Sequence, residues 1–162
     1  MNATELIVGV ADLAVAGPDA ILMTVGLGSC VAIVLYDSVE RVGGLAHVLL
    51  PSIALSRRDG KLGRVAETAV PRLLELMVAR GASRRRLVAR LVGGASMFAA
   101  LAPPGSIQMG ERNVVASRLT LRTHGIPLVG EAVGGDFGRT VRLFVADGRV
   151  EVRSVAHGVQ IL

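Results

Sequence analysis

The most constraining feature of this chain is a run of uncharged residues, 20–36, which contains its only cysteine, Cys30. A membrane-spanning helix needs about 20 predominantly apolar residues, and this shorter run is interrupted by glycine, serine and threonine. Two β-strands at 20–25 and 31–37, joined by a glycine turn, explain the pattern better. The second strand is apolar and β-branched, which is typical of a central strand. We therefore expect a sheet protein without membrane insertion.

The composition indicates one folded domain with an aliphatic core. The chain has 162 residues, of which 51% are hydrophobic and only 2% aromatic. A chain of this length suits a single domain, predicted to span residues 1–162. A lone cysteine cannot form an internal disulfide, and the N-terminus lacks the basic segment of a signal peptide. Both features favour a cytoplasmic location.

The remaining hydrophobic patterns predict an α+β fold. Apolar residues recur at the helical period over 64–81, although Pro71 within this segment predicts a kink or a late start of the helix. A second helix is predicted over 110–125. The other segments are predicted to be strands at 5–16, 41–50 and 86–95, a loop at 52–63, and a hairpin at 140–155. This order favours a mostly antiparallel or mixed sheet over a strictly alternating parallel one.

Two hairpins predict specific strand registers. Asp147-Gly148 is a two-residue turn signal, which would pair Val145 with Val150 and Leu143 with Val152. In the same way, a turn centred between Ser38 and Val39 would place Cys30 directly opposite His47. Directly opposed side chains have Cβ atoms about 4.5–5.5 Å apart. A thiol and an imidazole at that separation can share a proton.

This pairing has the chemistry of a nucleophilic site. A neighbouring imidazolium lowers the pKa of a thiol, and the thiolate is the nucleophile. The glycine turn before Cys30 could present backbone N–H groups near Gly28, Ser29 and Cys30 to a developing oxyanion. A third group usually orients the base, and Thr24 is the candidate because the turn brings it back alongside Cys30.

A structural alternative stays open from these patterns alone. Free cysteine is among the most buried residue types, and an apolar environment makes it inert. His124, at a predicted helix end, and His157, near the C-terminus, are weaker candidates than His47. No pair of histidines or cysteines has zinc-ligand spacing, and the glycine motifs lack the lysine of a P-loop. We therefore expect neither a metal nor another cofactor.

The charge of the chain points to protein partners before nucleic acid. The net charge is +5, and 17 of the 18 basic residues are arginine. The densest cluster, Arg84 to Arg86, has no interleaved aromatic residues for stacking on bases. A solvated loop is the first interpretation of this cluster, a protein contact the second and nucleic acid the third.

Five stretches together resemble the CheD family, the chemoreceptor glutamine deamidases of bacterial and archaeal chemotaxis. They occur in the family's order between about residues 24 and 141, and read "TVGLGSCVAIVLYD", "GGLAHVLLP", "GGASMF", "MGERNV" and "GGDFGRTV". The resemblance implies an α/β sandwich like that of the cytotoxic necrotizing factor toxins. It also implies a cysteine, histidine and threonine site, which by motif are Cys30, His47 and Thr24.

The resemblance implies an enzyme that converts glutamine side chains of methyl-accepting chemotaxis receptors to glutamate and releases ammonia through a thioester. Its implied partner is a CheC-like phosphatase. Two alternatives remain: an amidase or transglutaminase-like acyl transferase with the same site, and a non-catalytic adaptor that binds a CheC-like phosphatase. Reactivity of the Cys30 thiol would separate the catalytic readings from the adaptor.

Overall fold

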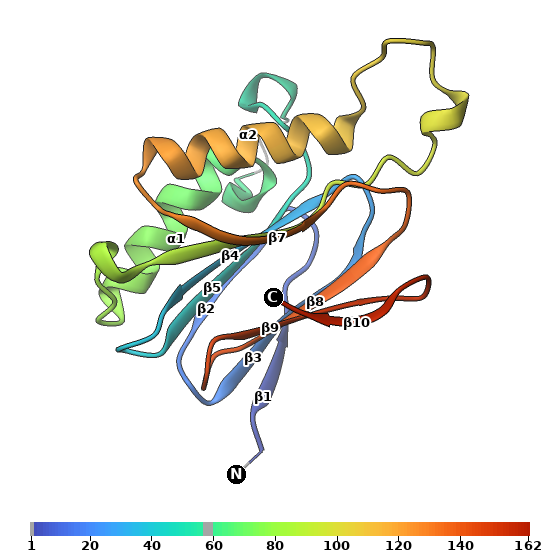
Figure 1. Ribbon diagram of the computed structural model, residues 1–162. Helices are drawn as coiled ribbons and strands as arrows, with labels where there is room; N and C mark the ends of the chain where they lie inside the picture. Colours follow the sequence, from blue (N-terminus) through green and yellow to red (C-terminus); the bar gives the residue numbers. More distant parts are fainter. Residues whose placement is uncertain (1, 57–59) are drawn as a thin grey trace.

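The computed structural model, which describes residues 2–56 and 60–162, has three layers: two five-stranded sheets and a layer of helices (Figure 1). The first sheet has the spatial order β1 (Thr4–Ile7), β3 (Ala20–Leu27), β8 (Arg139–Phe144), β9 (Arg149–Ser154) and β10 (Gly158–Ile161). The second has the order β2 (Leu13–Ala16), β5 (Val42–Val48), β4 (Val31–Asp37), β6 (Val88–Gly93) and β7 (Leu128–Val133). The main helices are α1 (Ala66–Ala79) and α2 (Met109–Thr123).

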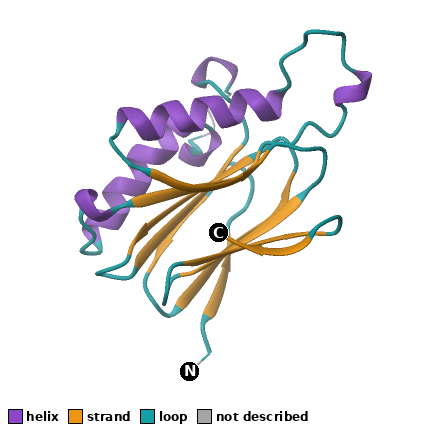
Figure 2. Cartoon of the chain, viewed as in Figure 1, coloured by secondary structure: helices purple, strands orange, loops and turns teal. Residues whose placement is uncertain are grey.

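The second sheet is the middle layer, with the helices on one face and the first sheet on the other (Figure 2). Its strand β4 is buried along its whole length. Ile33 and Leu35 belong to the core under the helices, whereas Ala32 and Val34 belong to the core between the sheets. The predictions of a central strand at 31–37 and of an α+β fold are therefore confirmed. The sheets are mixed, since β1–β3 and β6–β7 are parallel pairs.

The expected strand at 5–16 is wrong, because this segment forms two strands in different sheets. The chain crosses between the sheets at residues 8–12, where Ala11 has a left-handed φ of 64°. Backbone hydrogen bonds to both sheets fix this crossing segment: Val8 N–H donates to Met23 O, and Ala11 N–H donates to His47 O. Strands β7 and β10 were not expected. Every residue of β10 is exposed, so it carries little of the alternation that marks a strand.

Both helices are confirmed near their expected positions. Helix α1 starts at Ala66 and continues through Pro71, so the late start is wrong. It ends at Ala79, and Gly81 closes the helix end with a left-handed φ of 99° and an N–H that donates to Val78 O. The segment at 52–63 contains two short 3₁₀ turns, Ile53–Leu55 and Leu62–Arg64, and its residues 57–59 lie outside the described residues. Two more 3₁₀ turns occur at Arg84–Arg86 and Ala99–Leu101.

The hairpin of β8 and β9 exists, but its register differs by two residues from the prediction. Leu143 pairs with Val150 and Val141 with Val152. The turn closes at Phe144, whose carbonyl accepts the Gly148 N–H at 2.8 Å and the Asp147 N–H at 3.3 Å, so Val145 lies in the turn instead of pairing with Val150. A shift of two keeps each side chain on its expected face.

The hairpin of β4 and β5 is shifted in the same way, which corrects the predicted site geometry. Asp37 pairs with Val42, and His47 is opposite Ala32 rather than Cys30. The turn is two residues longer than expected, since the Asp37 carboxylate accepts the Val39 N–H at 2.9 Å and the Glu40 N–H at 3.2 Å. Because the shift is even, Cys30 and His47 still lie on the same face, as diagonal rather than direct neighbours.

Asp37 is expected to stabilise the fold above about pH 4. Burial alone raises the pKa of this carboxyl, but hydrogen bonds from Arg86 and the N–H groups of Ser83, Glu40 and Val39 outweigh burial and lower the pKa to about 2. An unfolded aspartate has a pKa of about 3.9, so the stabilisation is present above that value and is lost as the pH falls toward 2.

Asp37→Asn should therefore lower the free energy of unfolding at neutral pH by about 2 kcal/mol. The variant should also lose part of the acid sensitivity of the wild type. Urea unfolding between pH 2 and pH 7 measures both effects. The matched control is Glu40→Gln, since the exposed Glu40 lies 3.9 Å from Arg86. Equal losses in the two variants would contradict the special role of Asp37.

Candidate active site

The candidate site lies where the chain leaves β3 of the first sheet and enters β4 of the second. The pairing of β3 with β8 shifts register between Thr24 and Leu27, and Gly26 adopts a left-handed φ of 72° in this bulge. Such a φ is readily adopted by glycine and rarely by other residues. The bulge turns the chain across the layer between the sheets, so Thr24 enters this layer from one sheet and Cys30 from the other.

Thr24 and His47 form a buried hydrogen-bonded pair across this layer. The Thr24 hydroxyl donates to the Val8 carbonyl at 2.6 Å, which uses its only proton. His47 Nδ1 lies 2.7 Å from the same hydroxyl oxygen and must therefore donate to it. This assignment leaves Nε2 of the neutral imidazole without a proton. The pair thus fixes the tautomer in which Nε2 can act as a base.

The Nε2 atom of His47 is buried in the site and available to accept a proton. Nε2 is buried and has no hydrogen-bond partner among the described residues. The backbone of His47 is fixed in both directions, since its N–H donates to Asp12 O and its carbonyl accepts the Ala11 N–H. A buried imidazole nitrogen without a partner costs free energy. A nitrogen that must accept a proton during a reaction cannot have a permanent hydrogen-bond partner, which accounts for this free-energy cost.

The glycine-rich segment 93–95 holds the backbone around Cys30 in place. The Cys30 carbonyl accepts the Gly94 N–H at 2.8 Å, and the Gly28 carbonyl accepts the Ala95 N–H at 2.8 Å. Gly93 has a φ of +113°, and a Cβ at that position would lie 2.3 Å from the Cys30 oxygen. Only glycine permits this close approach. The motifs "GLGSC" and "GGAS" are therefore two sides of one contact.

Asn113 of α2 joins the two sides of the site. Its amide nitrogen donates to Ser29 O at 2.9 Å and to Leu49 O at 3.1 Å. Ser29 precedes the cysteine, and Leu49 follows the histidine strand by one residue. Sequence reasoning noted the motif "MGERNV" but gave no role to its asparagine. A polar residue on the buried face of an amphipathic helix was the available signal.

Burial sets the protonation states of Cys30 and His47. The Cys30 side chain is only 9% exposed. Burial raises the pKa of its thiol, and a contact with its own backbone N–H offsets this in part. Burial lowers the pKa of His47. The expected thiolate–imidazolium pair is thus disfavoured in the free protein, because burial favours the neutral form of both groups.

The backbone N–H groups at the turn differ in availability. Gly28 N–H donates to Gly26 O at 3.1 Å and is already engaged, which argues against the Gly28 amide as an oxyanion donor. The N–H groups of Ser29 and Cys30 make no backbone–backbone hydrogen bond with any described residue. A pocket of about 300 Å³ opens beside Ser29 and is lined by residues 95–98 and 108–110.

The other candidates stay apart from this site. His124 caps the end of α2, and His157 lies in the turn before β10, where its ring packs against Phe137. Within residues 2–56 and 60–162, no group of three or more His, Cys, Asp or Glu could hold a metal ion. None of the helices in these residues is long and apolar enough to cross a membrane.

Comparisons with known proteins identify the family of this chain. A thiol, an oriented imidazole and N–H groups that make no backbone–backbone hydrogen bond with any described residue have the chemistry for nucleophilic acyl transfer. The model of the family "CheD chemotactic sensory transduction" matches residues 49–154. The chain belongs to the CheD family.

Three relatives illustrate the extent of the similarity. The probable chemoreceptor glutamine deamidase CheD of Caldanaerobacter subterraneus subsp. tengcongensis is 43% identical, with 100% of both chains covered. That of Thermococcus kodakarensis is 44% identical over 95% of each chain. The chemoreceptor glutamine deamidase CheD of Halalkalibacterium halodurans is 41% identical, covering 93% of this chain and 94% of the relative.

One solved structure is similar over part of this chain. The hypothetical protein YfiH of Bacillus licheniformis superposes with a TM-score of 0.46 and 16% identity. The match covers 75% of this chain and 49% of that one.

Proposed function

We propose that this chain is a chemoreceptor glutamine deamidase of the cytoplasm, with Cys30 as nucleophile, His47 as base and acid, and Thr24 as the group that orients His47. The observation that carries the mechanism is the buried Thr24–His47 hydrogen bond, which leaves Nε2 unprotonated on the face that also bears Cys30. The relatives' names supply the substrate class, glutamine side chains of chemoreceptors.

The first half of the reaction forms a thioester. His47 Nε2 takes the thiol proton as the Cys30 sulfur attacks the amide carbon of the glutamine side chain. The carbonyl oxygen becomes an oxyanion, for which the N–H groups of Ser29 and Cys30 are the proposed donors. His47 then gives its proton to the amide nitrogen, the C–N bond breaks, and ammonia leaves.

The second half consumes water. His47 removes a proton from a water molecule, whose oxygen attacks the thioester carbon. The C–S bond breaks, the product leaves as glutamate, and the thiolate recovers the proton from His47. The same nitrogen thus serves as base and acid in each half, which requires a neutral imidazole at the start. Burial favours that state, because it lowers the pKa of His47.

The pocket beside Ser29 is the proposed entry for the glutamine side chain. Ser29 contributes to its lining and directly precedes the nucleophile. Its other walls are residues 95–98, of which Ala95 donates its N–H to the Gly28 carbonyl, and residues 108–110 at the start of α2. A side chain inserted there would bring its amide toward the N–H groups proposed to stabilise the oxyanion.

Thr24→Val is expected to lower kcat for deamidation by roughly tenfold to a hundredfold, because valine keeps the size but cannot hold Nδ1. The buried imidazole could then adopt the other tautomer, which places the proton on the catalytic nitrogen. Thr24→Ser is the matched control and should retain most activity, since it keeps the hydroxyl. Initial rates on a receptor fragment measure the effect. Equal activity of the valine and serine variants would contradict the orienting role.

The function itself is tested by incubating the protein with purified receptor cytoplasmic fragments. The expected result is release of ammonia together with conversion of particular glutamines to glutamate, seen by peptide mass spectrometry. A CheC-like phosphatase is the partner that the family resemblance implies. Co-purification with that phosphatase without any glutamine conversion would favour the adaptor alternative. Incorporation of added amines at the glutamines, in place of hydrolysis, would favour the acyl transferase.

A further inference from the structure

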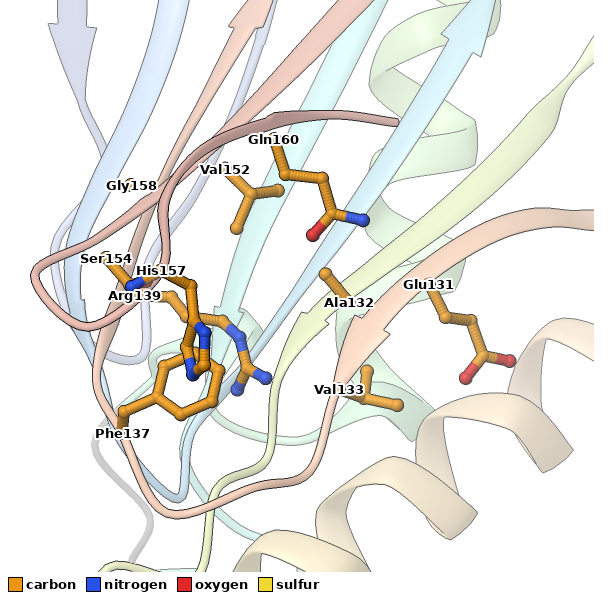
Figure 3. A pocket seen from close by; sticks show the side chains of 10 residues that line it. All are labelled: Glu131, Ala132, Val133, Phe137, Arg139, Val152, Ser154, His157, Gly158 and Gln160. Atoms are coloured by element: carbon orange, nitrogen blue, oxygen red, sulfur yellow. The ribbon is translucent and has the colours of Figure 1, made fainter.

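A second pocket, away from Cys30, lies between the sheets near the end of the chain and contains a buried arginine (Figure 3). On β8 the inward-facing residues are Arg139, Val141 and Leu143, so a charge occupies a position where the pattern calls for an apolar side chain. Arg139 is only 7% exposed. Burying a charge without a counter-charge is costly, so this arginine requires an explanation.

Arg139 has no carboxylate partner among the described residues. Its Nη1 donates to the carbonyls of Gly134 at 2.8 Å and Gly93 at 3.4 Å. The structure shows no hydrogen bond from its other nitrogens to any described residue. Since a guanidinium has five N–H groups, donor capacity remains on the side away from these carbonyls.

The surroundings hold this guanidinium in place and direct it to the pocket. It stacks over the Phe137 ring at 4.2 Å from the centroid, and the His157 ring packs against Phe137 at a centroid distance of 4.3 Å. Figure 3 shows the guanidinium between this ring pair and the β7 residues Ala132 and Val133. The stacking and the two hydrogen bonds to carbonyls already restrict the Arg139 side chain. A ligand that binds the guanidinium therefore causes a smaller loss of side-chain entropy.

The rest of the pocket suits a small anion with an apolar part. Its volume is about 390 Å³, within the range of roughly 300–1000 Å³ typical of small-molecule sites. Ala132, Val133 and Val152 supply apolar walls, while His157 and Gln160 add polar groups. The carboxylate of Glu131 also lines the pocket, but it is already paired with Arg118.

We propose that this pocket binds a small free carboxylate, whose two oxygens accept N–H groups from the Arg139 guanidinium. A planar guanidinium fork matches the two oxygens of a carboxylate. A doubly charged phosphate fits less well, since Arg139 is the one buried cation among the described residues that line the pocket. The site is separate from the deamidase mechanism and does not depend on it.

The test is a titration of the ¹⁵N-labelled full chain with sodium propionate, followed by NMR. The expected result is a saturable shift of the Arg139 Nε–H and of the amides of Gly134 and His157. Sodium chloride at equal ionic strength should not reproduce it. Inorganic phosphate forms a second arm and should bind more weakly than propionate.

Two variants locate the site. Arg139→Gln should weaken propionate binding roughly tenfold or more. Arg142→Gln, three residues along the same strand, should leave binding unchanged because Arg142 is paired with Glu5. If Arg139→Gln does not fold, Arg139→Lys provides the same test, since lysine keeps the charge but loses the fork. Absence of a saturable propionate shift in the wild type would overturn the proposal, as would tighter binding of phosphate or unchanged binding in the folded Arg139 variant.

Discussion

Cys30→Ala is expected to abolish receptor deamidation, with kcat lowered by about 10⁴-fold or more. The proposed thioester forms on the sulfur of this residue, and the chain has no second cysteine to replace it. Thr24 and His47 remain bonded to each other in the variant, but they have no nucleophile to activate. The measurement is the rate of glutamate formation in a receptor fragment under conditions in which the wild type reacts to completion.

The fold should survive this substitution, so loss of activity can be interpreted. Cys30 lies at the edge of the core between the sheets, and removal of one sulfur should lower the free energy of unfolding by about 1 kcal/mol. The control is Val34→Ala on the same face of β4, which also perturbs this core but leaves the thiol in place and lies opposite Leu45 rather than His47. Retention of more than a small fraction of wild-type activity by Cys30→Ala would exclude Cys30 as the nucleophile.

His47→Ala is expected to lower kcat by about 10²- to 10⁴-fold, the usual contribution of a general acid–base group. The effect on alkylation of Cys30 by iodoacetamide should be much smaller. Burial raises the pKa of the thiol and lowers that of His47. The free wild-type protein therefore holds little thiolate at neutral pH, and its alkylation rate should rise only toward alkaline pH.

A pH series of alkylation distinguishes this account from a preformed ion pair. If His47 acted by keeping Cys30 as a thiolate, the wild type would react rapidly at neutral pH and His47→Ala would shift its profile to higher pH. We expect similar profiles in both proteins, together with a large difference in deamidation. A rapid neutral-pH reaction that disappears in His47→Ala would contradict the neutral-pair mechanism.

The sequence predicted the two strands that flank the candidate site because their signals are local. Alternation, β-branching and glycine positions identify strands at 20–25 and 31–37 without knowledge of the rest of the chain. The strand register was not accessible in this way. The Asp37 carboxylate lengthens one turn by accepting two backbone N–H groups, and the Phe144 carbonyl closes the other turn by accepting the N–H groups of Asp147 and Gly148.

The protonation of the site was also beyond sequence reasoning, because it depends on burial. A cysteine and a histidine on neighbouring strands suggest an ion pair, whereas both side chains lie in an apolar layer between two sheets. The sequence predicted Thr24 as the group that orients the base, but not the hydrogen bonds that hold the threonine in place. Its hydrogen bond to His47 arises because the crossing at residues 8–12 brings the Val8 carbonyl over the threonine. Such long-range contacts leave no periodic signal.

The most direct test of the mechanism is interception of the proposed thioester with hydroxylamine during deamidation of a receptor fragment. Hydroxylamine competes with water for a thioester, so the wild type should convert the target glutamine partly to the hydroxamate and partly to glutamate. Cys30→Ala should give neither product. Formation of glutamate alone in excess hydroxylamine, or of hydroxamate by Cys30→Ala, would contradict covalent catalysis by Cys30.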